Sequence, residues 1–277
     1  MFEWLTELLS YTFIVRALVV GILVALCAAL LGVSLVLKRY AMIGDGLSHV
    51  GFGALSVSLA LGVAPLEVSL PVVALTAFLL MRLGENNMIK GDAAIAVISS
   101  SAIAIGIIVV SLTTGMNVDV YNYMFGSILA MSESDVVLSV LVSAVVLTLY
   151  VLFYNKIFAV TFDESFARAT GTHAGRYNML IAMLTALIIV VGMRMMGAML
   201  ISSLIIFPAL TSMRVFKSFK SVVLSAAILS IICFIIGIVI SFVWSVPAGA
   251  AVVVVNLVSF CVFCLARVIL KARAGRQ

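Results

Sequence analysis

The chain has 277 residues, of which 65% are hydrophobic and only 10% are charged, with a formal net charge of +5 and a mean hydropathy of +1.36. A soluble domain of this length needs far more charged side chains to cover its surface, so the composition excludes a soluble globular protein. It predicts an all-α protein: one domain, residues 1–277, folded as a polytopic bundle of membrane-spanning helices in contact with lipid. We expect no nucleic acid to bind it.

The first residues predict a helix on the membrane surface rather than a cleaved signal. A signal sequence begins with basic residues, whereas this chain begins with Glu3 and Glu7 and has no lysine or arginine in the same stretch. Phe2 and Trp4 supply apolar side chains beside these acids. We therefore expect an interfacial helix over residues 1–13.

Nine apolar segments follow, each close to the ~20 residues that a membrane-spanning helix needs, and they predict about nine such helices. The segments cover residues 14–37, 45–62, 66–83, 91–112, 135–154, 177–193, 198–213, 222–244 and 248–270. Between the fourth and the fifth, residues 117–134 are mixed in character and predict a short helix or a re-entrant piece.

The distribution of basic residues predicts the orientation of these helices. Cytoplasmic loops of membrane proteins carry an excess of lysine and arginine. If the C-terminus is cytoplasmic, nine spans place the N-terminus outside. Every one of the 16 basic residues except Arg16 and Arg194 then lies on the cytoplasmic side.

Asp45 and His49 are the candidate metal ligands. They lie four residues apart in the segment Gly-Asp-Gly-Leu-Ser-His, so a helix projects both from one face. Ionisable groups inside a membrane are costly and mark functional sites. An oxygen and a nitrogen ligand of this kind suit a divalent transition metal such as zinc or manganese.

Structural explanations compete with this one. Asp45 follows a glycine and could cap the N-terminus of its helix, and His49 could be a buried histidine that hydrogen-bonds a neighbouring helix. The small residues that follow, from Gly51 to Ala60, could leave space for a partly hydrated ion or could allow close helix packing. The sequence leaves these alternatives open.

Pro208 and the residues after it predict a cytoplasmic element. Proline is tolerated in the first turn of a helix and ends what precedes it, so we expect a short helix over residues 208–220. Its basic and aromatic side chains suit either a soluble partner or anionic lipid headgroups. The candidate contact residues are Pro208, Arg214, Phe216, Lys217 and Phe219.

Five stretches of sequence occur along nearly the whole chain. They are residues 40–49 (YAMIGDGLSH), 91–97 (GDAAIAV), 123–129 (YMFGSIL), 162–171 (FDESFARATG) and 197–209 (GAMLISSLIIFPA). Together they resemble the signatures of the zinc/manganese-type ABC importer permeases, the transmembrane subunits of metal ABC transporters.

This resemblance implies a type II ABC-importer-like fold and a translocating subunit of a prokaryotic cytoplasmic membrane, which is not itself an enzyme and binds no cofactor. An identical copy would complete a homodimer, two cytoplasmic ABC ATPase subunits would dock beneath it, and an extracellular metal-binding protein would deliver the ion. Residues 208–220 become the expected coupling helix, with residues 162–171 as a second candidate for ATPase contact. The sequence contains no Gly-x-x-x-x-Gly-Lys-Ser/Thr motif, so ATP hydrolysis must come from another polypeptide.

Other functions fit these residues less well. A catalytic zinc site is not expected, because the chain has only two histidines and lacks His-Glu-x-x-His. Copper(I) prefers sulfur ligands, but the methionines clustered between residues 193 and 199 are also common apolar fillers. The remaining alternative is a self-sufficient metal ion channel or carrier without an ATPase. For an importer, we expect zinc rather than manganese to be the transported ion.

Overall fold

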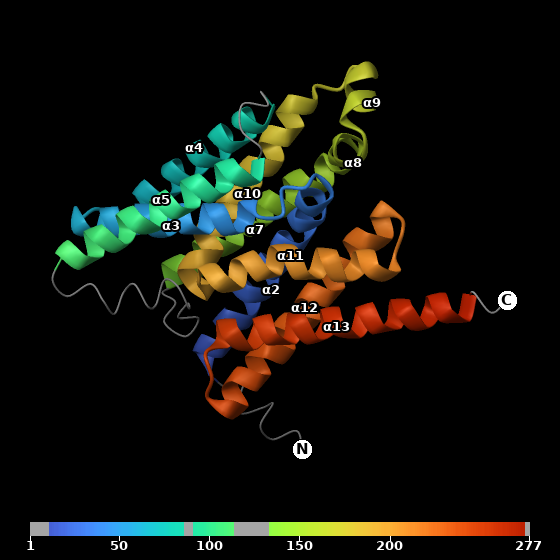
Figure 1. The fold of residues 1–277 in the computed structure, drawn as a ribbon. Coiled ribbons are helices and arrows are strands. Elements are labelled where there is room, and N and C mark those ends of the chain that lie inside the picture. Colours follow the sequence, from blue (N-terminus) through green and yellow to red (C-terminus); the bar gives the residue numbers. More distant parts are fainter. Residues whose placement is uncertain (1–10, 86–90, 114–132, 275–277) are drawn as a thin grey trace.

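The computed structural model describes residues 11–85, 91–113 and 133–274, which form eleven α-helices and no strand (Figure 1). The predicted interfacial helix and the mixed stretch before residue 133 lie mainly outside these residues. In chain order the helices are α2 (Thr12–Leu37), α3 (Ile43–Ala60), α4 (Pro65–Glu85), α5 (Gly91–Leu112), α7 (Glu133–Leu152), α8 (Tyr154–Phe162), α9 (Glu164–Ala169), α10 (Ala174–Met196), α11 (Ala198–Val215), α12 (Phe219–Trp244) and α13 (Ala248–Ala274).

Seven of the described helices are long and apolar enough to cross a membrane, namely α2, α5, α7, α10, α11, α12 and α13. The expected all-helical membrane fold is therefore confirmed, but the count of nine spans is not supported. Each predicted apolar segment corresponds to a helix, yet two of these helices differ from the rest. α3 carries Asp45, His49 and several glycines and serines, which lower its hydropathy, and α4 contains Pro71 and has a shorter apolar run.

Two helices were missed by the sequence reasoning, α8 and α9. Neither contains a long apolar run, which is the signal that identifies membrane spans. Asp163 separates them with an extended backbone, and its side chain accepts a hydrogen bond of 2.9 Å from the backbone N–H of Phe166. This N-cap starts α9 as a helix of its own.

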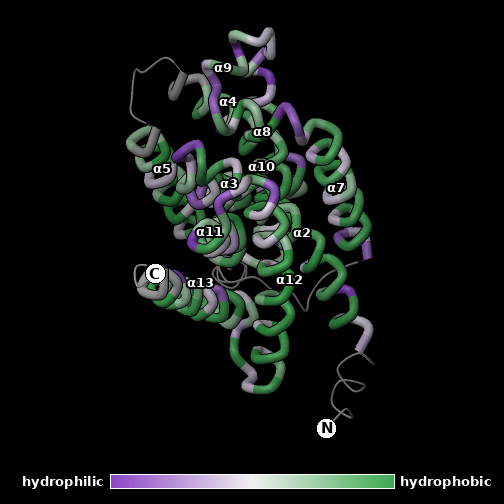
Figure 2. Tube along the Cα trace, turned by 90° about the vertical axis from the view of Figure 1, so that its right-hand side faces the viewer, coloured by the Kyte–Doolittle hydropathy of each residue, from purple (hydrophilic) through white to green (hydrophobic). Residues whose placement is uncertain are grey.

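α2 and α3 form the centre of the bundle. α2 packs against α7, α10, α11 and α12, whereas α3 packs against α4, α5, α10 and α11. Most of the large buried side chains lie where these helices meet. Figure 2 shows hydrophobic residues along most of α2, α7 and α12, with hydrophilic residues gathered around α9. Between α10 and α11, Gly197 has a φ of +84°, a backbone conformation that favours glycine and allows the chain to reverse.

The predicted helix over residues 208–220 is wrong. Pro208 lies inside α11, which continues to Val215, and α12 begins at Phe219 after a short turn (Figure 1). A proline inside a membrane helix is tolerated when neighbouring helices satisfy the freed backbone groups, and α11 is packed between α2, α12 and α13. The expected coupling helix is therefore the end of one long helix, a turn and the start of the next.

The helix ends form two distinct groups at opposite ends of the bundle. The α8–α9 segment, the α11–α12 turn and the end of α13 lie toward one end, on the right in Figure 1. At the other end, Arg16 of α2 lies 2.6 Å from Glu133 of α7, and Arg194 of α10 lies 3.1 Å from Asp135 of α7. Arg16 and Arg194 are the two basic residues that we expected on the opposite side of the membrane from the other basic residues. Both are thus paired with acids of α7.

Candidate metal site

Asp45 and His49 lie on the first two turns of α3, and their side chains meet. The Asp45 Oδ2 atom is 3.4 Å from His49 Nε2, and the two side chains are 41% and 24% exposed, respectively. Most other residues of α3 are buried. The predicted pair therefore lies together on the side of α3 that the described helices leave partly open.

The two structural explanations for this pair do not hold. The N-cap of α3 is Met42, and Asp45 is the third residue of the helix. Asp45 is thus not the cap, although a carboxylate in the first turn still interacts favourably with the helix dipole. The contact found for His49 is Asp45 on its own helix, not a group on a neighbouring helix.

The small residues after His49 serve helix packing. Gly51 and Gly53 are buried, as are Ser56 and Ser58. A Cβ atom on Gly53 would lie 2.7 Å from the backbone oxygen of Ala102, so α3 and α5 approach too closely for any side chain there. Of the two alternatives that the sequence left open, the structure supports close packing for this part of α3.

Ser202 is a neighbour of the site that sequence reasoning missed. Its hydroxyl lies near enough to the carboxylate of Asp45 to interact with it, and it is 3.4 Å from the hydroxyl of Ser48. Ser202 comes from α11, far along the chain, so spacing alone does not link it to Asp45. The sequence offered one signal for it: Ser202 and its neighbour Ser203 are the two hydroxyl residues of the otherwise apolar segment 197–209.

One chain supplies too few ligands for a complete metal site in its described part. No third histidine, cysteine, aspartate or glutamate joins Asp45 and His49 among the residues that the structure describes. A tetrahedral zinc needs four ligands and an octahedral manganese six. The exposed position of the pair leaves room for ligands from outside this chain.

The five candidate contact residues between 208 and 220 have different environments. Pro208 is buried, Arg214 lies over the ring of Phe260 at 5.1 Å, and Phe219 packs against α8, with its ring centroid 5.0 Å from that of Phe158. The two that are exposed are Phe216 and Lys217.

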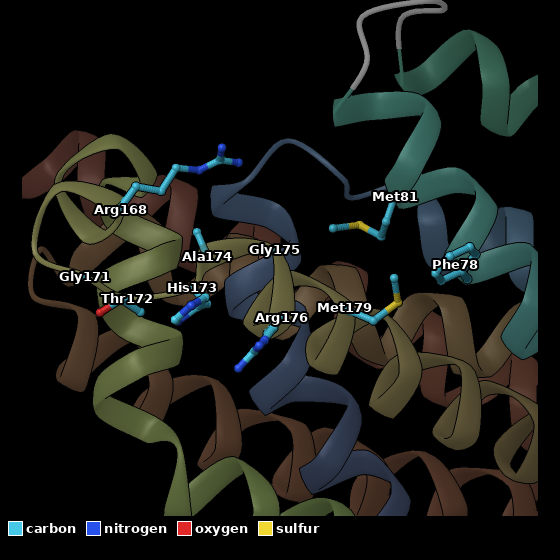
Figure 3. A pocket seen from close by; sticks show the side chains of 10 residues that line it. All are labelled: Phe78, Met81, Arg168, Gly171, Thr172, His173, Ala174, Gly175, Arg176 and Met179. Atoms are coloured by element: carbon cyan, nitrogen blue, oxygen red, sulfur yellow. The ribbon is translucent and has the colours of Figure 1, made fainter.

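The α8–α9 segment is the more exposed of the two candidates for ATPase contact. The side chains of Phe162 and Phe166 are 77% and 65% exposed. Beside α9 lies a cavity of about 950 Å³. In Figure 3, Arg168 extends from α9 near this cavity, which Phe78 and Met81 line from the side of α4.

Glu164 of α9 is held by three donors. Asn178 Nδ2 and Lys38 Nζ each lie 3.1 Å from its Oε2 atom, and Arg168 donates to Oε1 at 2.6 Å. Burial raises the pKa of Glu164, but the hydrogen bonds from Asn178 and Arg168 and the charge of Lys38 outweigh burial and lower that pKa to about 2. Glu164 is therefore ionised throughout the physiological range of pH.

A comparison with known proteins identifies the family of this bundle. The model of the ABC 3 transport family matches residues 10–267. The chain belongs to the ABC 3 transport family. The match covers the candidate site, the α8–α9 segment, the α11–α12 turn and nearly all of the described helices, so this ABC 3 chain is a multi-pass membrane protein of that family over most of its length.

The relatives of this ABC 3 chain include proteins named for manganese transport and for zinc uptake. MntC, a manganese transport system membrane protein of Halalkalibacterium halodurans, is 28% identical over 90% of this chain and 85% of its own length. ZnuB, a high-affinity zinc uptake system membrane protein of Haemophilus influenzae, is 30% identical over 88% and 94%. The solved structure of PsaBC from Streptococcus pneumoniae in complex with Fab is 28% identical, with a TM-score of 0.84 over 94% of each chain. The resemblance to metal ABC transporter permeases is confirmed.

Proposed function

We propose that this chain is the translocating subunit of an ATP-driven importer for a divalent transition metal in the cytoplasmic membrane of a prokaryote. The observation that carries the proposal is the Asp45–His49 pair, an oxygen and a nitrogen ligand side by side on an accessible face of a helix in a membrane protein. The names of the relatives MntC and ZnuB support it. ATP hydrolysis by separate subunits would alternate the access to this ion site.

The proposal includes a second, identical copy of the chain. Two ligands per chain are too few for the metals considered, whereas a two-fold axis beside α3 would supply four. The other proposed partners are two cytoplasmic ABC ATPase subunits and an extracellular metal-binding protein that delivers the ion. The chain itself then hydrolyses nothing and holds no resident cofactor.

We propose zinc as the preferred ion. Asp45 Oδ2 and His49 Nε2 are 3.4 Å apart, close enough for one ion to bind both. Two Asp45–His49 pairs would also give four ligands, the number that zinc takes in tetrahedral sites. Octahedral manganese would need two further oxygen ligands, such as waters.

The experiment that tests the function uses the chain reconstituted in liposomes with its ATPase subunits and its metal-binding protein. We expect zinc to stimulate ATP hydrolysis and to accumulate in the direction of import, with manganese second and magnesium inactive. Metal uptake that persists without the ATPase would favour the channel or carrier instead. Absence of transport for every divalent transition metal would remove the proposed function.

We propose that the C-terminus lies in the cytoplasm and the N-terminus outside. One end of the bundle holds α8, α9 and the α11–α12 turn, with basic residues that include Lys156, Arg176 and Lys217. At the opposite end, Arg16 and Arg194 are each paired with an acid of α7. Excess positive charge is thus concentrated at the first end, as the positive-inside rule requires of a cytoplasmic face.

We propose that the ATPase docks mainly on the α8–α9 segment, with the α11–α12 turn beside it. Buried aromatic anchors dominate the energy of most interfaces. Phe162 and Phe166 can serve as such anchors because their side chains are largely exposed, even though the ring of Phe162 also contacts that of Phe158. Phe219 is less suitable, since it already packs against Tyr154 and Phe158 of α8.

Replacing Phe162 and Phe166 together with alanine should detach the ATPase. Loss of an interface anchor of this kind costs about 2 kcal/mol or more, so we expect at least a tenfold drop in the ATPase that co-purifies with the chain. Phe242→Ala, which truncates an exposed phenylalanine near the other end of α12, is the matched control and should retain it. If Phe216→Ala causes the larger loss, the α11–α12 turn is the main contact.

A further inference from the structure

A buried lysine connects α9 to the segment that leads into the candidate metal site. Lys38 is the C-cap of α2, and its side chain is only 9% exposed. Its ammonium group donates to Glu164 Oε2 of α9 at 3.1 Å and to Asn178 Oδ1 of α10. Asn178 also donates to the same Glu164 oxygen at 3.1 Å. We call these three residues the Lys38 bridge.

Mutual hydrogen bonds hold the three residues of the Lys38 bridge together. Its three residues come from three different helices or helix ends, and each contacts the other two. Asn178 is 3% exposed, so water offers little replacement for a lost partner. Charge-assisted hydrogen bonds in such surroundings are stronger than the exposed ion pair at the other end of α2. A displacement of α9 must therefore break the bridge or move the end of α2.

The end of α2 leads directly to the metal ligands. After Lys38 the chain turns at Arg39, which has a φ of +63°, and α3 begins at Ile43. Asp45 lies in the first turn of α3. Only this short turn separates the Lys38 bridge from the start of the helix that carries the site.

We propose that the Lys38 bridge couples movement of α9 to α3, so that Lys38 is a positioning residue for transport. The inference rests on the proposed function, in which the ATPase docks on α9 and drives the ion site. Nucleotide-driven displacement of α9 pulls on Lys38 through Glu164, and the α2–α3 turn passes this displacement to Asp45 and His49. Without the bridge, the ATPase still binds and hydrolyses ATP, but α3 follows less completely.

The test measures metal ions imported for each ATP hydrolysed by the reconstituted complex. In Lys38→Met, Glu164 keeps Asn178 and Arg168 as partners, so the fold should persist. Energetic coupling between sites typically amounts to about a 5- to 150-fold effect, and we expect the imported ions per ATP to fall at least about fivefold. ATPase co-purification and basal hydrolysis should stay within about twofold of the unchanged protein, and Lys38→Arg should restore most of the ratio.

The matched control is Arg16→Met, which removes an ion pair at the opposite end of the same helix and should leave the ratio unchanged. If Lys38→Met does not yield folded protein, Lys38→Gln removes the same charge but keeps a polar side chain, and it tests the bridge by the same ratio. An unchanged ratio in the bridge variants overturns the inference, and so does loss of the ATPase from them, because Lys38 would then serve docking alone. Failure of the unchanged protein to transport metal would instead reject the proposed function.

Discussion

Asp45→Asn and His49→Ala should each abolish metal uptake while leaving the protein folded in the membrane. Asparagine keeps the shape of aspartate but removes the negative charge that a dication requires, and alanine removes the nitrogen ligand. Changes in groups that only orient metal ligands typically cost about 10- to 100-fold in affinity, so loss of a ligand should cost at least about 100-fold. Uptake of radioactive zinc into cells or proteoliposomes measures the effect.

A carboxylate elsewhere in the chain provides the control for these variants. Glu67 lies in the first turn of α4, as Asp45 does in α3, and its side chain is exposed. Glu67→Gln should leave zinc uptake unchanged. Near-normal uptake by both Asp45→Asn and His49→Ala would show that the ion follows another route, whatever the distance between the two side chains.

Gly32→Ala should prevent folding of most of the protein. A Cβ atom at Gly32 of α2 would lie 1.9 Å from the backbone oxygen of Ile205 in α11, so α2 and α11 must move apart. Overpacking of a core costs about 1–3 kcal/mol, and more when a backbone cannot yield. We expect most of the monodisperse protein to be lost in detergent, and the remainder to unfold roughly 5–10 °C lower.

Gly21 on the same helix offers a comparison within the bundle. A Cβ atom there would meet the tip of the Phe234 ring, which is a side chain rather than backbone. Gly21→Ala should therefore lower the yield and the unfolding temperature less than Gly32→Ala. Equal losses would indicate that both sites respond to added volume alone and that the backbone contact has no special weight.

Hydropathy predicted the fold class and most helix positions, because burial in lipid imposes long apolar runs that are visible in a sequence. It did not separate α3 and α4 from the seven helices that are long and apolar enough to cross a membrane, and it did not reveal α8 and α9. α3 meets its neighbours through glycines, α9 starts at the Asp163 cap, and α8 has no side-chain cap at its start. Such features leave no extended hydropathy pattern in the sequence from which a helix could be predicted.

The proline at position 208 shows a different limit. In a soluble protein a proline inside a helix removes a hydrogen bond and usually ends the helix, and this rule predicted a new helix there. Inside a bundle, neighbouring helices stabilise the continuous helix, as they do for α11. The sequence shows the proline but not the helices packed around it.

The candidate site was only partly accessible to sequence reasoning. Asp45 and His49 share a helix, so their spacing predicted that the side chains meet. Ser202, Glu164 and Asn178 depend on contacts between helices that are distant in sequence. Lys38 entered the sequence analysis only as one positive charge among others, since its partners cannot be read from spacing.

The aromatic contacts of α8 link the α8–α9 segment to the α11–α12 turn. The ring of Phe219, the first residue of α12, lies 5.8 Å from that of Tyr154 and 5.0 Å from that of Phe158. A force applied to α8 would therefore reach α12 as well as α9. Because α12 also packs against α11 and α13, the same displacement would extend to the C-terminal helices.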